Sequence, residues 1–446
     1  MSVSPFDSAI HRQLFGDAEM GRLFSDTAEI RAMMLVLGAL AKAQGRAGVI
    51  PEVSGAFLAR AMMEVQIDPA GLADSVGRNG VSVPGLVAAL RKALDAPEHA
   101  TWLHFGATSQ DIQDTGLMLR LRQVLALIEA RLVMASARLA DLAEAAAEMP
   151  MAARTYGQVA VPTSFGAMVA GWGWPVMRAV ERVRALRPRL VVSLSGAGGT
   201  ASMLGEDPAA IRADLAEALG LADPGRSWHA DRSLIAELGH LLQEVTAASA
   251  KAGEDLLILT RSDVVEVRLG GGGASSTMPQ KENPVAPSVL VALVRFAAAQ
   301  GAALGHPHRE ARDGAGWFTE WLVLPGLAMA AGKSAAVLAD VMAQVEPDAA
   351  AMETRLTAAP GLIHAEALSF ALARHMPRPE AQAEVKRLAG EARATGRPLP
   401  DLVAKAYPGL DLSGLSSLGQ APAEARAFAR EARKIGDGQG QGVNLD

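Results

Sequence analysis

Apolar residues recur at intervals of three and four positions over long stretches of the chain. One series consists of Leu117, Leu121, Val124, Ile128, Leu132, Ala135, Leu139 and Leu142, and a second of Leu234, Leu238, Leu241, Val245, Ala248, Ala252, Leu256 and Leu259. This spacing places the apolar side chains on one face of a helix. The second series predicts a helix of about 30 residues, roughly 45 Å long. Helices of this length are typical of bundles.

Three further stretches show helical spacing, at about residues 172–186, 285–305 and 317–345. With the first two they predict a central bundle of about five long helices. The ends of the chain contain shorter segments, interrupted by proline and glycine. We therefore expect an all-α fold with three domains: a helical N-terminal domain (1–105), a central bundle (106–355) and a helical C-terminal domain with a flexible tail (356–446).

Composition and charge narrow the class of protein. Hydrophobic residues make up 50% of the chain and charged residues 20%, which is typical of a folded globular protein. The net charge of -6 provides no basic field for nucleic acid, so we expect no nucleic-acid partner. With 0 cysteines there is neither a disulfide framework nor a thiolate nucleophile. The N-terminal residues lack the pattern of a secretory signal, and we expect a cytoplasmic protein.

The run from Val285 to Gly305 is nearly long enough to span a bilayer, and Arg295 is its only charged residue. Arg295 near the middle, Pro287 near the start and many small residues favour a helix buried among protein neighbours. We expect a core helix and no association with a membrane.

The segment 269–284, LGGGGASSTMPQKENP, lies between two of the long helices. Asn283 is a suitable N-cap and Pro284 a suitable first helical residue, so the loop is expected to lead into a helix N-terminus. The free N–H groups there, together with Lys281 and the Asn283 amide, would favour a carboxylate or an enediolate. Beside them, a serine hydroxyl could exchange a proton with carbon. The alternative is a flexible glycine linker followed by a capped helix.

Residues 275–284 closely resemble the signature loop of the fumarase/aspartase superfamily. Two further segments match the family in the right order: residues 104–115 (HFGATSQDIQDT) and residues 154–163 (RTYGQVAVPT). The resemblance extends over nearly the whole chain and includes residues 228–232 (WHADR). It implies a small-molecule enzyme without a cofactor or metal, in which each pocket is built from three subunits of a homotetramer.

The resemblance also implies the roles of individual residues. Ser275 matches the residue that transfers the proton, while Lys281 and Asn283 match groups that hold a substrate carboxylate and stabilise the aci-carboxylate intermediate. The expected substrate-binding residues are Thr108, Ser109, Arg154, Thr155, Gln158, Ser276 and Met278. Two of these have structural alternatives: Thr108 could be an N-cap with Asp111 in capping-box spacing, and Arg154 could form a structural ion pair. Arg309 and Arg312 could help to bind a tricarboxylate, and buried packing is the commoner explanation for His104, His229 and His364.

Tyr156 occupies the position at which adenylosuccinate lyases have a histidine general acid. Elimination of an amine requires protonation of a poor leaving group, whereas opening a lactone releases a carboxylate that is already stable as an anion. Within the superfamily the chain is most similar to the lactone-forming cycloisomerases that act on 3-carboxymuconate, a small tricarboxylate. Two alternatives remain: a lyase that releases fumarate from adenylosuccinate or a related adduct, and a non-catalytic member such as the lens crystallins that resemble argininosuccinate lyase. We expect Tyr156 to belong to the catalytic residues with Ser275, Lys281 and Asn283, in a reaction that needs less help from an acid.

Overall fold

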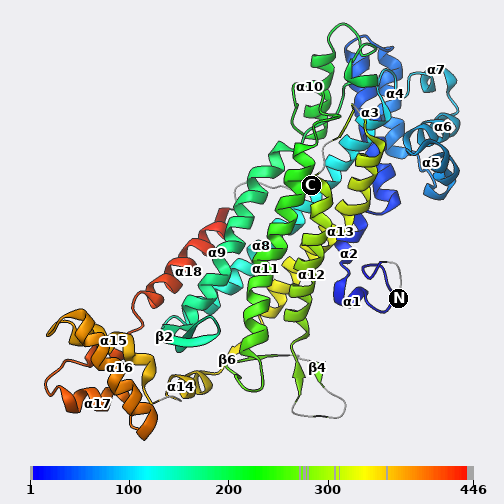
Figure 1. The fold of residues 1–446 in the computed structure, drawn as a ribbon. Coiled ribbons are helices and arrows are strands. Elements are labelled where there is room, and N and C mark those ends of the chain that lie inside the picture. Colours follow the sequence, from blue (N-terminus) through cyan, green and yellow to red (C-terminus); the bar gives the residue numbers. More distant parts are fainter. Residues whose placement is uncertain are drawn as a thin grey trace. The chain divides into compact units, whose positions relative to one another are not determined.

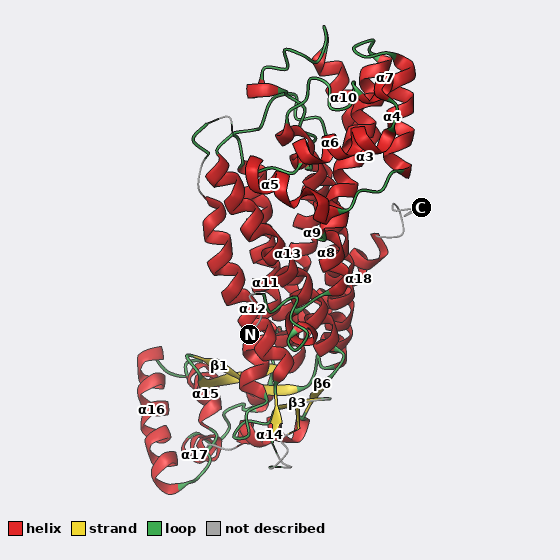
Figure 2. Cartoon of the chain, turned by 90° about the vertical axis from the view of Figure 1, so that its right-hand side faces the viewer, coloured by secondary structure: helices red, strands yellow, loops and turns green. Residues whose placement is uncertain are grey.

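The computed structural model describes residues 4–270, 273–274, 278, 281–305, 308–310, 312–357 and 360–438. Most of these residues are helical (Figures 1 and 2). The five predicted long helices are all present: α8 (Ser109–Ala145), α9 (Phe165–Leu186), α11 (Ser233–Leu259), α12 (Val285–Gly301) and α13 (Gly314–Met342). The predicted helical fold class is therefore confirmed.

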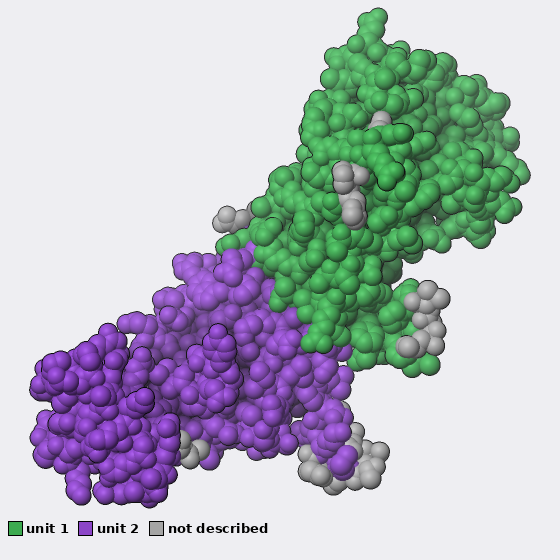
Figure 3. Space-filling view, in the orientation of Figure 1, with its two compact units in different colours: residues 1–131, 179–247, 292–335 green, residues 132–178, 248–291, 336–446 purple. Residues whose placement is uncertain are grey.

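The chain divides into two compact units (Figure 3). Unit 1 comprises residues 1–131, 179–247 and 292–335, and unit 2 comprises residues 132–178, 248–291 and 336–446. Each boundary falls inside one of the five long helices, so every long helix contributes residues to both units. The division into three domains at residues 105 and 355 stays a prediction.

Unit 1 also contains the shorter helices α1 (Arg12–Phe15), α2 (Ala18–Leu23), α3 (Asp26–Arg46), α4 (Glu52–Glu64), α5 (Ala73–Asn79), α6 (Val83–Leu94), α7 (Pro97–Ala100) and α10 (Pro208–Leu219). Unit 2 contains α14 (Ala349–Thr357), α15 (Ala365–Leu372), α16 (Arg378–Thr395), α17 (Leu399–Ala406) and α18 (Ala421–Asp437). Short 3-10 helices cover Pro69–Leu72, Arg187–Arg189, Ala197–Gly199, Ala302–Gly305, Leu362–His364 and Ser413–Ser416.

Each unit has its own apolar core. In unit 1, α3 packs against α4 and α10 around buried Leu37, Leu58 and Leu215 (Figure 1). In unit 2, α15, α16 and α17 surround a second cluster that includes Leu372 and Leu402. The apolar series that predicted α8 and α11 is buried along nearly its whole length, which explains why helical periodicity located these helices well.

Three two-stranded antiparallel sheets occur in the part of the chain that the structure describes, and none was predicted. They pair β1 (Pro150–Thr155) with β2 (Gln158–Ser164), β3 (Val267–Leu269) with β6 (Val345–Pro347), and β4 (Gly273–Ala274) with β5 (Glu282–Asn283). All lie in unit 2. The first and third are the hairpins that carry two of the motifs identified in the sequence.

Two helical stretches are long and apolar enough to cross a bilayer by length and composition, Val285–Gly305 and Gly314–Met342. In their most apolar windows, 33% and 67% of the residues are buried within the fold, respectively. The second stretch therefore has the burial of a core helix. In the first, predicted as a core helix, Ala292, Arg295 and Ala299 share an exposed face, so this chain covers the helix only in part.

Candidate functional site

The first predicted motif lies at the N-terminus of α8 in unit 1. Thr108 directly precedes the helix and Ser109 is its first residue. The Thr108 N–H donates to Asp111 Oδ2 at 3.0 Å, which is one half of a capping box. The structural role anticipated for this spacing is thus present. Thr108 and Ser109 therefore lie at the N-terminus of a 37-residue helix, where the helix dipole favours binding of an anion.

The second motif forms the turn of the β1–β2 hairpin in unit 2. Thr155 pairs with Gln158, and Tyr156 and Gly157 make the two-residue connection. Both turn residues have positive φ, 51° and 72°, as a type I′ turn requires. The Tyr156 side chain is fully solvent-exposed in this chain, with a relative exposure of 104%. Thr155 and Gln158 therefore lie side by side at a hairpin tip from which Tyr156 projects.

Arg154, one residue before this turn, forms an ion pair with Glu266. Arg154 Nη2 donates to Glu266 Oε1 at 2.8 Å, and Nη1 lies 2.8 Å from Oε2. The Glu266 side chain is completely buried, and that of Arg154 is 17% exposed. Of the two roles considered for Arg154, the geometry matches the structural ion pair.

The third motif lies at the β4–β5 hairpin in unit 2. Ser275 and Ser276 are outside the described residues. Met278, Lys281 and Asn283 are all exposed, and the Lys281 N–H donates to the carbonyl of Met278 at 3.0 Å. Asn283 pairs with Gly273 in the hairpin.

The helix after this motif begins one residue later than predicted. The Ser288 N–H donates to the carbonyl of Pro284 at 3.2 Å, so Pro284 is the N-cap and Val285 the first helical residue. The prediction of Asn283 as N-cap was wrong because Pro287 has no N–H to donate to the Asn283 carbonyl. Asn283 instead ends strand β5, two residues before the first helical residue.

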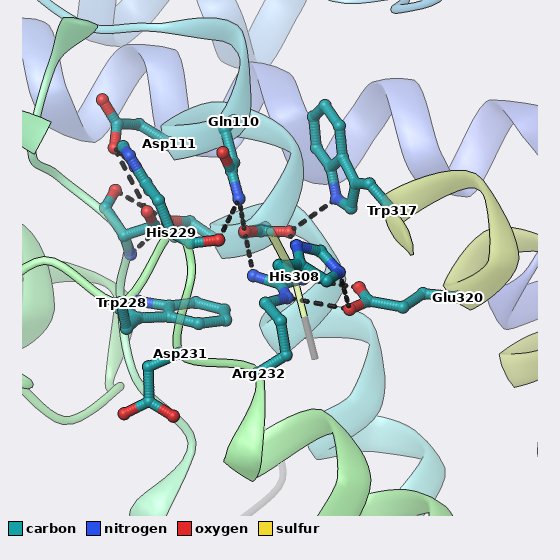
Figure 4. Close-up of polar contacts among 12 residues, drawn as sticks. Gln110, Asp111, Trp228, His229, Asp231, Arg232, His308, Trp317 and Glu320 are labelled. Carbon is teal, nitrogen blue, oxygen red and sulfur yellow. Dashed lines mark hydrogen bonds and ion pairs between the residues drawn. The ribbon is translucent and has the colours of Figure 1, made fainter. Parts of the chain in front are cut away.

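A buried polar cluster in unit 1 joins α8 to α13 (Figure 4). Arg232 Nη1 and Nη2 contact Asp114 at 2.6 and 3.1 Å, and Nε and Nη2 contact Glu320 at 2.8 and 2.6 Å. His308 Nε2 lies 3.2 Å from Glu320 Oε1, and Trp317 Nε1 donates to Asp114 at 3.1 Å. A guanidinium between two carboxylates is the kind of pairing that permits such burial. This cluster was not predicted, although an aspartate on the apolar face of a predicted helix was a signal for a buried polar contact.

His104 lies four residues before Thr108 and adopts a left-handed conformation with φ 65°. Burial lowers the pKa of its imidazole below the ordinary value, and the Arg91 guanidinium acts in the same direction. The Thr108 backbone and Asp111 act in the opposite direction but do not compensate. The neutral imidazole is therefore favoured in the fold.

Unit 1 contains a cavity of about 850 Å³, lined by Glu29, Gln113, Arg120 and Trp321 among others. None of the predicted site residues that the structure describes lines this cavity. Within the described ranges, no group of three or more His, Asp or Glu side chains could hold a metal ion.

Comparison with known proteins gives the family. A lyase family model matches residues 18–299. The chain belongs to the fumarase/aspartase superfamily. Over 372 residues, covering 82% of the chain and 81% of the relative, it is 38% identical to 3-carboxy-cis,cis-muconate cycloisomerase of Pseudomonas aeruginosa. It is also 35% identical to nitrosuccinate lyase of Streptomyces davaonensis over 404 residues, 86% of the chain and 84% of the relative.

Solved structures agree with this assignment to the superfamily. The 3-carboxy-cis,cis-muconate lactonizing enzyme of Pseudomonas putida superposes with a TM-score of 0.88 at 30% identity, over 96% of this chain and 100% of that one. The resemblance inferred from the three motifs is therefore confirmed, and the chain is an enzyme of this superfamily. Superfamily members act on small molecules and are typically oligomeric.

Proposed function

We propose that the enzyme is a 3-carboxy-cis,cis-muconate cycloisomerase, which interconverts this tricarboxylate and 4-carboxymuconolactone without a cofactor. The observation that carries the proposal is the 38% identity to the cycloisomerase of Pseudomonas aeruginosa over 82% of the chain. Tyr156, in place of a histidine acid, supports the same reaction because a carboxylate leaving group needs no protonation.

The proposed reaction adds no heavy atom to the substrate and removes none, but the three-carboxylate substrate takes up one proton as it becomes a lactone with two carboxylates. One carboxylate oxygen adds to the ring-forming carbon of a conjugated double bond. The π electrons shift to the neighbouring carbon and its carboxylate, which gives an aci-carboxylate. The Ser275 hydroxyl then donates a proton to that carbon and regains a proton from solvent. The reverse direction removes the same proton and expels the ring carboxylate.

The roles of the other residues follow from the charge that develops. The substrate carries three carboxylates, which are ionised near neutral pH. Lys281 and Asn283, beside the N-terminus of α12, would stabilise the aci-carboxylate, since fixed donors act most strongly where charge develops. Thr108 and Ser109, at the N-terminus of α8, and Thr155 and Gln158, at the hairpin tip, would hold the remaining carboxylates. Ser276 and Met278 belong to the same loop as Ser275 and would complete the binding surface.

We also propose that the functional form is a homotetramer whose pockets combine motifs from different subunits. Tyr156 is entirely exposed in one chain, and Leu322 of α13 is 81% exposed. Only 33% of the most apolar window of Val285–Gly305 is buried by this chain. Exposed apolar surface of this kind marks protein interfaces.

The absence of cysteine suits a reducing compartment, and we place the enzyme in the cytoplasm.

A spectrophotometric assay tests the proposed reaction against its alternatives. Loss of the conjugated diene is followed on adding the enzyme to 3-carboxymuconate, and fumarate release is followed from adenylosuccinate and from nitrosuccinate in parallel. We expect turnover of 3-carboxymuconate alone. Nitrosuccinate is included because a lyase for it is a 35% identical relative. Fumarate release without diene loss would make the chain an eliminating lyase, and no reaction in any arm would favour the non-catalytic alternative.

The Ser275→Ala variant tests the assigned proton donor. We expect at least about a hundredfold loss of kcat, the size typical of removing a general acid. Tyr156→Phe should lose much less. Full activity in the Ser275→Ala enzyme would refute the assignment, and an equal loss in both variants would promote Tyr156 to a main catalytic role.

A further inference from the structure

One carboxylate organises the start of α8. Asp111 is fully buried and accepts hydrogen bonds from five donors. Its Oδ2 accepts from the backbone N–H groups of Thr108 and Gly196, at 3.0 and 2.9 Å. Its Oδ1 accepts from the Ser195 N–H at 2.9 Å, the Ser193 hydroxyl at 3.1 Å and His229 Nε2 at 2.8 Å. The orientation of this carboxylate therefore determines where the Thr108 backbone lies.

The donors come from three places in the chain. Thr108 is local, and Ser193, Ser195 and Gly196 belong to a single loop. His229 lies in a third segment, and its imidazole is the group of that segment that contacts Asp111 (Figure 4). Its own position is fixed, because the Gln110 amide donates to the His229 carbonyl at 3.0 Å. His229 thus supplies Asp111 with a donor that comes neither from the loop nor from the Thr108 turn, and it is itself anchored to α8 through Gln110.

Loss of one donor leaves a buried carboxylate with an unsatisfied acceptor, which costs free energy. The side chain is then expected to rotate towards another donor, or a water molecule to enter and replace the lost donor. Either response disturbs the Thr108 N–H, which shares the same carboxylate. The side chain of His229 is only 4% exposed, so solvent does not readily replace its contribution.

We propose that His229 is a positioning residue, which holds the Thr108–Ser109 turn in its carboxylate-binding geometry through Asp111. The inference rests on the proposed function, because it takes Thr108 and Ser109 as substrate ligands. His229 itself does not touch substrate. Its effect is on binding in the ground state and in the transition state alike, which predicts a higher KM with little change in kcat.

Two amide substitutions that differ by one methylene test this role. In His229→Gln the amide nitrogen reaches the place of Nε2 and keeps the hydrogen bond to Asp111, whereas in His229→Asn it stops short. We expect a KM for 3-carboxymuconate about tenfold higher in the Asn variant, the effect of losing one hydrogen bond to a buried charge, and nearly normal in the Gln variant. Trp228→Phe is the matched control, because it removes a neighbouring buried hydrogen bond, from Trp228 Nε1 to the Val192 carbonyl at 2.9 Å, without touching Asp111.

Amide hydrogen exchange, followed by mass spectrometry over residues 104–112, provides a readout that does not depend on the reaction. We expect faster exchange in His229→Asn than in the wild type, His229→Gln or Trp228→Phe. Equal exchange and equal KM in the Asn and Gln variants would overturn the proposal. If the wild type does not turn over 3-carboxymuconate, the proposed function fails and the exchange comparison alone decides whether His229 holds the turn.

Discussion

His104 makes the stability of the folded protein depend on pH. Its φ of 65° is uncommon outside glycine, and its pKa is lowered by burial. The unfolded chain therefore takes up a proton at a higher pH than the folded protein does. Stability contributed by neutral His104 is complete above about pH 6.5 and is lost as the pH falls from there towards the folded pKa.

The His104→Asn variant isolates this effect, because asparagine tolerates the same φ and does not titrate in this range. We expect the free energy of unfolding, measured by urea denaturation at about pH 7.5 and about pH 5.5, to fall less on acidification than in the wild type. The exposed His240→Asn substitution is the control. Identical pH dependence in the His104→Asn and wild-type proteins would contradict the account.

The Arg154→Met variant separates the two roles considered for Arg154. Removing the guanidinium leaves Glu266 buried without its partner, and we expect a loss of about 3–5 kcal/mol in the free energy of unfolding. The double variant Arg154→Met with Glu266→Leu should recover part of that loss. Denaturant unfolding measures both. If Arg154→Met kept its stability but raised KM, Arg154 would be a substrate ligand rather than a structural ion pair.

At the scale of elements, the packing of α9 against α18 in unit 2 depends on one glycine. A Cβ placed on Gly173 would lie 1.9 Å from Cζ of Phe428, whereas one on Gly171, in the same helix, would meet nothing within 4 Å. Phe428 is fully buried and stacks edge-on against Trp174 with ring centroids 5.5 Å apart. The aromatic ring has no open space into which it could move.

We expect Gly173→Ala to destabilise the protein by about 1–3 kcal/mol, because overpacking outweighs the gain in helix propensity. Gly171→Ala should stabilise by about 0.5–1 kcal/mol, since alanine loses less backbone entropy than glycine. Thermal unfolding of the two variants beside the wild type provides the comparison. A Gly173→Ala protein as stable as Gly171→Ala would show that the two helices do not pack as described.

The elements differ in how far the sequence predicted them. α8 and α11 were located closely because their apolar faces are buried along nearly the whole length. The β1–β2 hairpin was missed, although its Tyr156–Gly157 turn has the backbone of a hairpin, because strand β1 (PMAART) shows no alternation of apolar and polar residues. The motif residues were found by family resemblance. Asp114 on an apolar helix face indicated a buried polar partner, but its partner Arg232, like the partner His229 of Asp111, lies 118 residues away and could not be identified from the sequence.

The proposed shared pockets require several copies of the chain. Leu322 projects from α13 with 81% of its surface exposed, a large apolar side chain that an interface would cover. We expect light scattering to give a mass four times that of the chain. A buried charge at this position would weaken the assembly, so Leu322→Glu should give smaller species and lower activity. Lys42→Glu, at an exposed position on α3, is the control. A fully active monomer would contradict shared pockets.

Running the reaction on 3-carboxymuconate in D₂O, with NMR analysis of the product, shows whether the enzyme protonates carbon when the ring closes. We expect 4-carboxymuconolactone carrying a single deuterium on its exocyclic methylene carbon, because an exchangeable hydroxyl delivers one deuteron to the carbon beside the new ring bond. Recovery of unchanged substrate without lactone, or a lactone with no deuterium at that carbon, would contradict the proposed reaction.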